Sequence, residues 1–237
     1  MSLNRFRLAA SVMSAALPEP CLCLVTDRSL ASSGDLVRWV SLAVGGGVDL
    51  VQLREKDLPG SQFLKLATEL RSAIGTHALL IVNGRADLAA EAGAQGVQLG
   101  EEAMTVGAAR KLLPSGSLVG RSVHTVEAAL SAVSEGADFL LVGTMYATDS
   151  HPGVPPDGPA LMRAVAQDCR IPLIGIGGIT RDNLSEVIAA GASGVAVIRS
   201  ILAAPDPRGA ARELKQSLAD AWRSRPSLTN PQEVRSE

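Results

Sequence analysis

The chain alternates between short apolar runs and longer amphipathic stretches, and this alternation constrains its fold more than any other feature. Each apolar run is followed by about ten or more residues with helical periodicity, which is the pattern of βα units. Eight runs have the length and composition of strands: 21–26, 50–54, 79–82, 96–99, 118–122, 139–142, 173–176 and 195–198. Most of them are continuously apolar, as expected of parallel strands that are covered on both faces.

Eight βα units in about 200 residues predict an α/β fold with a single domain, the (β/α)8 TIM barrel. A glycine-led turn precedes every second strand: Gly47-Val48-Asp49, Gly93-Ala94-Gln95, Gly136-Ala137-Asp138 and Gly191-Ala192-Ser193. Glycine can end a helix in the left-handed conformation without a steric penalty. The repeat favours a closed barrel over an open doubly wound sheet, which would need only about five or six strands.

We expect three segments along the chain: an N-terminal extension over 1–20, the barrel over 21–223 and a disordered C-terminal tail over 224–237. The extension has the outline of a signal peptide, because Arg5 and Arg7 precede a mild apolar run. Serines interrupt that run and no clean cleavage site follows it, so a loose or helical extension is the favoured interpretation.

The composition excludes several classes of partner. With 22 basic and 24 acidic residues, the net charge of −2 gives no broad field that would attract nucleic acid or an anionic membrane. No run reaches the roughly 18–20 apolar residues that span a bilayer. The three cysteines Cys21, Cys23 and Cys169 suit neither a disulfide framework nor a zinc ribbon, so we expect buried thiols in a cytoplasmic protein. The sequence leaves the oligomeric state open, a homodimer included.

Active sites of such barrels form at the carboxyl ends of the strands. After the second strand, alternation points Gln52, Arg54 and Lys56 to one side, where two cations would suit a phosphate or a carboxylate. The alternative is a surface ion-pair network with Glu55 and Asp57. We favour a binding role, because polar groups inside an apolar strand are costly unless they are used.

Two further strand ends carry polar candidates. Asn83 follows the third strand and could either orient a polar substrate or cap the next helix. Ser122 and His124 lie at the end of the fifth strand, and a histidine there suits proton transfer near neutral pH. The alternative is that Thr125 caps the following helix and His124 merely flanks it.

The last three strands predict a flap and a phosphate site. The loop over 143–158 is the longest in the barrel and is typical of a flap over a site. Gly177-Gly178 follows the seventh strand and Arg199-Ser200 the eighth, the two strand ends at which such barrels often hold a phosphate on backbone N–H groups. A plain tight turn is the alternative for the glycine pair. No convincing cluster of metal ligands is present, although Asp27, Glu101 and Glu102 stand at strand ends.

These strand-end residues resemble the thiamin-phosphate synthase superfamily. The matching pieces are Thr26-Asp27, Gln52-Leu53-Arg54-Glu55-Lys56, Asn83, Gly96-Val97-Gln98-Leu99-Gly100, Ser122-Val123-His124 and Ile176-Gly177-Gly178-Ile179. The resemblance implies a (β/α)8 barrel that binds a thiazole phosphate as its small-molecule partner.

Departures from the family pattern bear on which branch the chain resembles. The synthase branch joins a pyrimidine diphosphate to thiazole phosphate and uses Mg²⁺ held by two aspartates. Here the matching positions are Gly84 and Ala103. A diphosphate-binding lysine of the flap is replaced by His151, although Thr148 and Ser150 persist as substrate-binding candidates.

The chain is more similar to the thiazole tautomerase branch, through Asn83-Gly84-Arg85 and Gly120-Arg121-Ser122-Val123-His124. The resemblance implies that the protein aromatises a carboxythiazole phosphate tautomer without a cofactor, with His124 as the proton carrier. Two alternatives stay open: a Mg²⁺-dependent thiamin-phosphate synthase, and a regulator that binds thiazole phosphate without catalysis.

Overall fold

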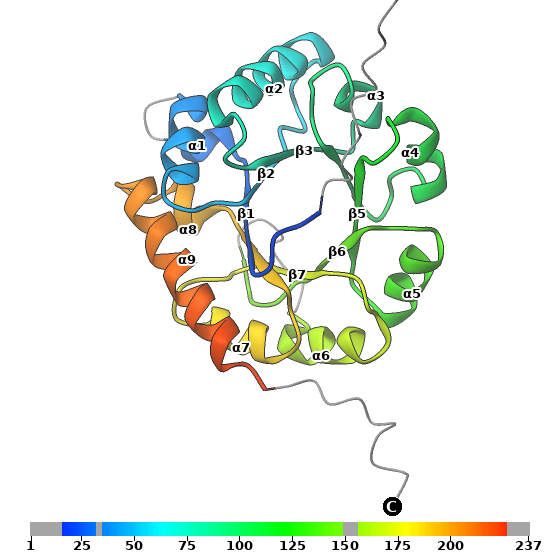
Figure 1. Cartoon of the computed structure of the whole chain (residues 1–237), viewed down its shortest axis with the longest axis vertical. Coiled ribbons are helices and arrows are strands. Elements are labelled where there is room, and N and C mark those ends of the chain that lie inside the picture. The colour runs from blue at the N-terminus through cyan, green and yellow to red at the C-terminus, as the bar shows by residue number, and fades with distance from the viewer. Residues whose placement is uncertain (1–15, 32–34, 149–155, 227–237) are drawn as a thin grey trace, which may run out of the picture.

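The structure is a computed structural model that describes residues 16–31, 35–148 and 156–226. Eight parallel strands pair in sequence order, and β1 also pairs with β8, so the sheet is a closed barrel (Figure 1). The strands are β1 Cys21–Val25, β2 Leu50–Leu53, β3 Leu79–Asn83, β4 Gly96–Leu99, β5 Leu118–Val123, β6 Phe139–Val142, β7 Leu173–Ile176 and β8 Gly194–Val197. The predicted TIM barrel is confirmed, and each expected strand lies within one residue of its observed bounds.

Helices surround the barrel; α1 to α7 connect consecutive strands, and α8 and α9 follow the last strand (Figure 1). They are α1 Leu36–Val44, α2 Gly60–Ile74, α3 Ala86–Ala89, α4 Val106–Leu112, α5 Val126–Ser134, α6 Gly158–Asp168, α7 Leu184–Ala189, α8 Arg199–Leu202 and α9 Pro207–Ser224, with a short 3-10 helix at Arg28–Leu30. The side chains of Asp35, Thr105 and Thr125 cap α1, α4 and α5 by accepting a backbone N–H of the first turn.

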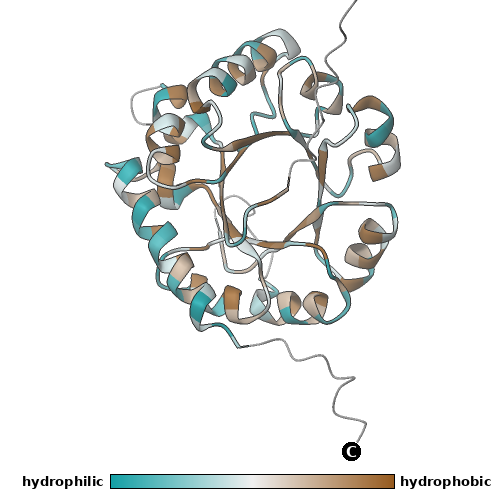
Figure 2. Cartoon of the chain, viewed as in Figure 1, coloured by the Kyte–Doolittle hydropathy of each residue, from teal (hydrophilic) through white to brown (hydrophobic). Residues whose placement is uncertain are grey.

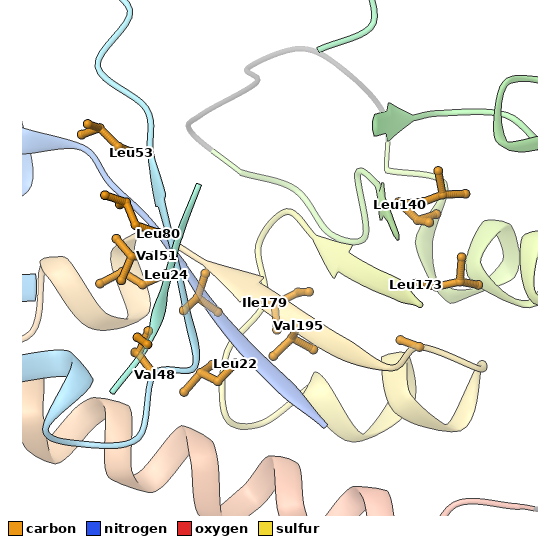
Figure 3. Close-up of a cluster of buried hydrophobic side chains, with 14 of the residues drawn as sticks. Leu22, Leu24, Val48, Val51, Leu53, Leu80, Leu140, Leu173, Ile179 and Val195 are labelled. Atoms are coloured by element: carbon orange, nitrogen blue, oxygen red, sulfur yellow. The ribbon is translucent and has the colours of Figure 1, made fainter. Parts of the chain in front are cut away.

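Alternation along the strands separates two apolar layers. Side chains that point inward fill the barrel, and they include Cys21, Cys23, Phe139, Leu141 and Ile174. The outward side chains pack against the helices and form the larger cluster. Figure 3 shows Leu24, Val51 and Leu80 gathered on the same side of β1, β2 and β3. In Figure 2 the strands are brown and the outer faces of several helices are teal, as two-sided burial of the sheet requires.

The glycine-led repeat has a structural reason beyond the glycine. The residue just before β2, β4 and β6 accepts, through its side chain, a backbone N–H of the preceding odd-numbered strand. Asp49 accepts from Leu22 N at 2.7 Å, and Asp138 accepts from Val119 N at 2.6 Å. Gln95 does the same for Leu80 N at 2.7 Å. Three of the four repeats therefore tie the amino ends of two strands together: β1 with β2, β3 with β4, and β5 with β6.

Both chain ends of the described barrel differ slightly from the expected boundaries. Leu17, within the expected extension, packs against the inward apolar cluster, and the residues before β1 cross the end of the barrel that faces the viewer in Figure 1. At the other end, α9 continues to Ser224. The rest of the expected extension and tail, 1–15 and 227–237, lies outside the described residues.

The three cysteines are unpaired and buried, as expected. Burial raises the pKa of each thiol, most strongly for Cys21 and Cys23 inside the barrel, so these groups stay protonated and unreactive. Among the described residues, no helix has the length and apolar character needed to cross a membrane.

Candidate active site

The carboxyl ends of the eight parallel strands open at one end of the barrel, where the inward side chains change from apolar to polar. Gln52 and Gln98 are almost fully buried in this polar layer, with exposed fractions of 2% and 0%. Gln52 Nε2 donates to Asn83 Oδ1 at 3.0 Å, and Gln98 Nε2 donates to Ser122 Oγ at 3.0 Å. The structure thus pairs Gln52 with Asn83 and Ser122 with Gln98, and the register of β3 and β4 sets Asn83 beside Gln98.

The side-chain carbonyl oxygens of both glutamines are buried without a partner in the described part of the chain. Leaving a buried acceptor unpaired costs about 1–3 kcal/mol, so native proteins rarely do so without a reason. Two such acceptors at the floor of the mouth are available to an N–H or O–H group of a ligand or to water. Gln98 was not among the predicted site residues, although a glutamine inside the apolar run 96–99 is the same signal that pointed to Gln52.

Arg54 and Lys56 do not share one extended segment. β2 ends at Leu53, and the half-buried Arg54 follows it directly. Lys56 is exposed and lies in a turn that the Leu58 N–H closes on the Glu55 carbonyl at 3.3 Å. The alternation that predicted a common side therefore applies as far as Arg54, while the direction of Lys56 depends on the turn.

His124 follows β5 and is held across to the end of β6. Its Nδ1 lies 2.6 Å from the carbonyl oxygen of Gly143. A carbonyl oxygen only accepts, so Nδ1 carries the hydrogen, and in the neutral ring Nε2 is the basic nitrogen. Thr125 does cap α5, with its hydroxyl accepting from Ala128 N at 3.1 Å. Both interactions are present, because Thr125 caps the helix and its neighbour His124 bonds to Gly143 O.

The glycine pair after β7 meets the loop after β6 at close range. Gly177 and Gly178 have φ of +106° and +59°. A Cβ on Gly177 would lie 2.6 Å from Thr144 Cγ2, and one on Gly178 would lie 2.5 Å from Ala147 O. Both positions therefore require glycine for packing, whatever they bind. This tight approach brings the phosphate candidates of β7 under the start of the predicted flap.

The β8 end is joined to the β7 end as well. Ser200 Oγ donates to the carbonyl oxygen of Ile179 at 2.7 Å, and Asn183 Nδ2 donates to that of Gly178 at 3.0 Å. Arg199 begins α8 beside Ser200. Gly177, Gly178, Arg199 and Ser200 therefore lie at neighbouring strand ends, where the sequence predicts a site that binds a phosphate.

The first part of the flap is fixed against β7. The N–H groups of Met145 and Tyr146 donate to Ile176 O at 2.9 Å and to Gly177 O at 3.0 Å. The Tyr146 hydroxyl donates to Glu186 Oε2 at 2.9 Å, and burial together with this bond raises its pKa to about 12. Thr148 is described, whereas the predicted site residues Ser150 and His151 lie outside the described residues.

The two positions that match the magnesium-binding aspartates of the synthase branch provide no ligand for the ion. Gly84 and Ala103 have no side-chain oxygen, and no group of three or more His, Cys, Asp or Glu residues is placed to hold a metal in the described ranges. Mg²⁺ takes oxygen ligands, commonly one or two carboxylates together with substrate phosphates. Arg121 instead ties down the loop after β4, donating to Met104 O at 2.9 Å and to Glu101 O at 2.8 Å. The residues present do not fit a carboxylate-held magnesium.

A closed eightfold barrel with a polar mouth, an oriented histidine and a glycine pair after β7 defines the (β/α)8 class, whose active sites lie at the carboxyl ends of the strands. The sequence model of the family described as thiamine monophosphate synthase matches residues 22–201. The chain belongs to this family.

Individual relatives agree with this family. A thiamine-phosphate synthase of Methanoculleus marisnigri is 42% identical over 202 residues, covering 84% of this chain and 96% of that protein. A protein of Geobacter sulfurreducens that carries the same name provisionally is 46% identical over 195 residues, covering 81% of this chain and 92% of its own.

Among solved structures, the thiamine phosphate pyrophosphorylase of Pyrococcus furiosus is similar with a TM-score of 0.78 and 34% identity, over 85% of this chain and 96% of that chain. These names favour the synthase alternative over the tautomerase branch that the motifs suggest. The family is thereby established, and the tautomerase branch stays a prediction.

Proposed function

We propose that the protein is an isomerase of thiamin biosynthesis that aromatises a carboxythiazole phosphate tautomer by proton transfer. The observation that carries this proposal is the hydrogen bond between His124 Nδ1 and Gly143 O at 2.6 Å. It fixes the ring and leaves Nε2 as the base, at a strand end that faces the mouth. A histidine suits this task because both of its protonation states are accessible near neutral pH.

The proposed step balances without a co-reactant. Nε2 of His124 takes the proton from ring carbon two, and the electrons of that C–H bond shift through the conjugated ring to the exocyclic side-chain carbon. The imidazolium then returns the proton to that carbon, which leaves an aromatic thiazole and a neutral histidine. General acid–base catalysis of this kind typically contributes about 10²–10⁴-fold.

The remaining site residues would hold the two ends of the substrate. We assign the phosphate to the β7–β8 end, where Gly177, Gly178 and Ser200 lie together. We assign the ring carboxylate to Arg54 with Lys56, because a guanidinium matches a carboxylate in geometry and charge. The amides of Gln52 and Asn83 would line the floor beneath the ring.

Thiamin-phosphate synthesis is the second candidate function, and the names of the relatives favour it. That reaction joins a pyrimidine diphosphate to thiazole phosphate, and the buried acceptors of Gln52 and Gln98 could receive the amino group of a pyrimidine. Against it stand Gly84 and Ala103, which supply no carboxylate for the magnesium diphosphate.

Two assays on the purified protein separate the candidates. The first supplies the carboxythiazole phosphate tautomer without metal and follows formation of the aromatic product. The second supplies the pyrimidine diphosphate, thiazole phosphate and Mg²⁺, and follows formation of thiamin phosphate. We expect turnover in the first assay alone. Robust Mg²⁺-dependent synthesis would overturn the proposal, and tight binding of thiazole phosphate with no turnover in either assay would favour a regulator.

A further inference from the structure

At the mouth of the barrel, between the carboxyl ends of β1 and β2, lies a buried carboxylate that the proposed reaction does not use. The Glu55 side chain is only 4% exposed. Its Oε1 accepts from Thr26 Oγ1 at 2.7 Å and from the Arg28 N–H at 3.1 Å, and its Oε2 accepts from Arg28 Nη1 at 3.0 Å. A buried carboxylate persists only when it is paired and hydrogen-bonded, so these contacts hold Glu55 in one orientation.

The hydroxyl that binds Glu55 also binds the backbone of Arg54. Thr26 is fully buried, and its Oγ1 accepts from the Arg54 N–H at 2.9 Å. The Thr26 N–H in turn donates to the carbonyl oxygen of Gln52 at 2.9 Å. The backbone on both sides of Leu53 is therefore tied to the end of β1 just where the strand finishes.

Arg28 closes this cluster on its outer side. Its Nη1 donates to Asp57 Oδ1 at 2.6 Å, and its Nη2 also pairs with Asp57. These contacts raise the pKa of Arg28 and lower that of Asp57. The pair with Asp57 is exposed and contributes little to stability, whereas the contacts with Glu55 lie inside the protein.

We propose that Glu55, held by Thr26 and Arg28, is a positioning residue that directs Arg54 into the mouth. Successive side chains of an extended segment point to opposite sides. Alternation from β2, which holds as far as Arg54, puts Arg54 on the side where Gln52 lines the barrel interior, and Glu55, fixed beneath the loop that follows β1, holds the chain in that direction just after Arg54. The inference rests on the proposed function for the identity of the group that Arg54 meets, the ring carboxylate.

The test measures equilibrium binding of two probes by calorimetry: thiazole phosphate, and the same compound with a carboxylate on ring carbon two. Wild type should bind the carboxylated probe more tightly. Thr26→Val removes the hydroxyl at nearly constant size and should weaken binding of the carboxylated probe about tenfold, the scale of one hydrogen bond to a charged group. Binding of the other probe should stay within about twofold, because the β7–β8 contacts are unchanged.

Two further variants make the result specific. Thr26→Ser restores the hydroxyl and should recover selectivity. Ser29→Ala is the matched control: it removes a hydroxyl from the same loop whose partner is Asp27, 2.6 Å away, and not Glu55, so selectivity should not change. Thermal unfolding of each variant checks that it is folded. If Thr26→Val does not fold, Glu55→Gln, which keeps the size but removes the charge, takes its place with the same expectation.

The inference is overturned if the folded variants keep wild-type selectivity, if they lose affinity for both probes equally, or if wild type itself does not distinguish the probes. The proposed function is tested separately, by the assay for conversion of the tautomer. A protein that shows this pattern of selectivity but does not convert the tautomer loses the proposed reaction and retains the positioning role of Glu55.

Discussion

Under the proposed function, the orientation of the His124 imidazole ring decides whether the site can move a proton. His124→Ala should slow conversion of the tautomer about 10²–10⁴-fold, which corresponds to roughly 3–5.5 kcal/mol of barrier. Binding of thiazole phosphate should stay close to wild type, because the phosphate candidates lie at β7 and β8. Single-turnover rates and a binding titration measure the two effects independently.

His151 is the rival for this role. It falls in the loop predicted as a flap, outside the described residues, and sites built on loops are less precise than sites at strand ends. His151→Ala should therefore reduce affinity more than turnover. A His124→Ala protein that turns over at the wild-type rate, together with a collapse in His151→Ala, would transfer the role to His151.

Gly178 offers a second test at the level of one residue, with Gly84 as its control. Both have positive φ, +59° and +71°, so alanine costs each about 1–2 kcal/mol in backbone conformation. Only at Gly178 would the new Cβ meet backbone, at 2.5 Å from Ala147 O, whereas nothing lies within 4 Å at Gly84. Gly178→Ala should therefore lose about 1–3 kcal/mol more, the usual cost of overpacking, in urea unfolding. Equal losses would mean that the flap moves aside freely.

At the level of the elements, the residues just before β2, β4 and β6 should act as clamps. Asp138 Oδ2 accepts from Val119 N at 2.6 Å and from Arg110 Nη2 at 2.6 Å. Asp138→Ala leaves the strand N–H without its acceptor and should lower the free energy of unfolding by about 1–3 kcal/mol. Urea unfolding measures this loss. Glu69→Ala, on the exposed face of α2, is the control and should stay within about 0.5 kcal/mol of wild type; a similar loss in both would contradict the clamp.

The strands were predictable because each is buried on both faces and so appears as a continuous apolar run. The sequence showed the clamp residues only as part of a repeated turn. Their function could not be predicted, because the bond that Val119 N donates to Asp138 Oδ2 depends on how β5 and β6 are aligned. The same reason hid the cluster around Glu55, whereas Gln98 could have been predicted from its place inside an apolar run. In the sequence, Glu55 stands between two cations and suggests a surface network, whereas its buried partner Thr26 follows a different strand, β1.

At the scale of the whole molecule, the packing inside the barrel supports the floor of the site. A Cβ on Gly120 would lie 2.2 Å from Phe139 Cζ and 2.2 Å from Gln98 Oε1. Gly120→Ala should therefore destabilise the protein by about 1–3 kcal/mol through overpacking. Phe139→Leu opens space beside Gly120 and leaves a void of its own, so it should destabilise the protein as well.

The double variant should lose less free energy of unfolding than the sum of the two single losses, by a coupling of about 0.5–3 kcal/mol. The reason is that the methyl group added at position 120 fills the space that the smaller side chain leaves at position 139. Urea unfolding of wild type, both single variants and the double variant measures this coupling. Additive losses would show that the two side chains do not share one space. In the double variant the new methyl group no longer meets Phe139 but still lies against Gln98 Oε1. We therefore expect part of the stability to return, whereas affinity for thiazole phosphate should stay below that of wild type. That split would separate the role of the barrel interior in folding from its role in supporting the glutamine amides at the proposed ligand site.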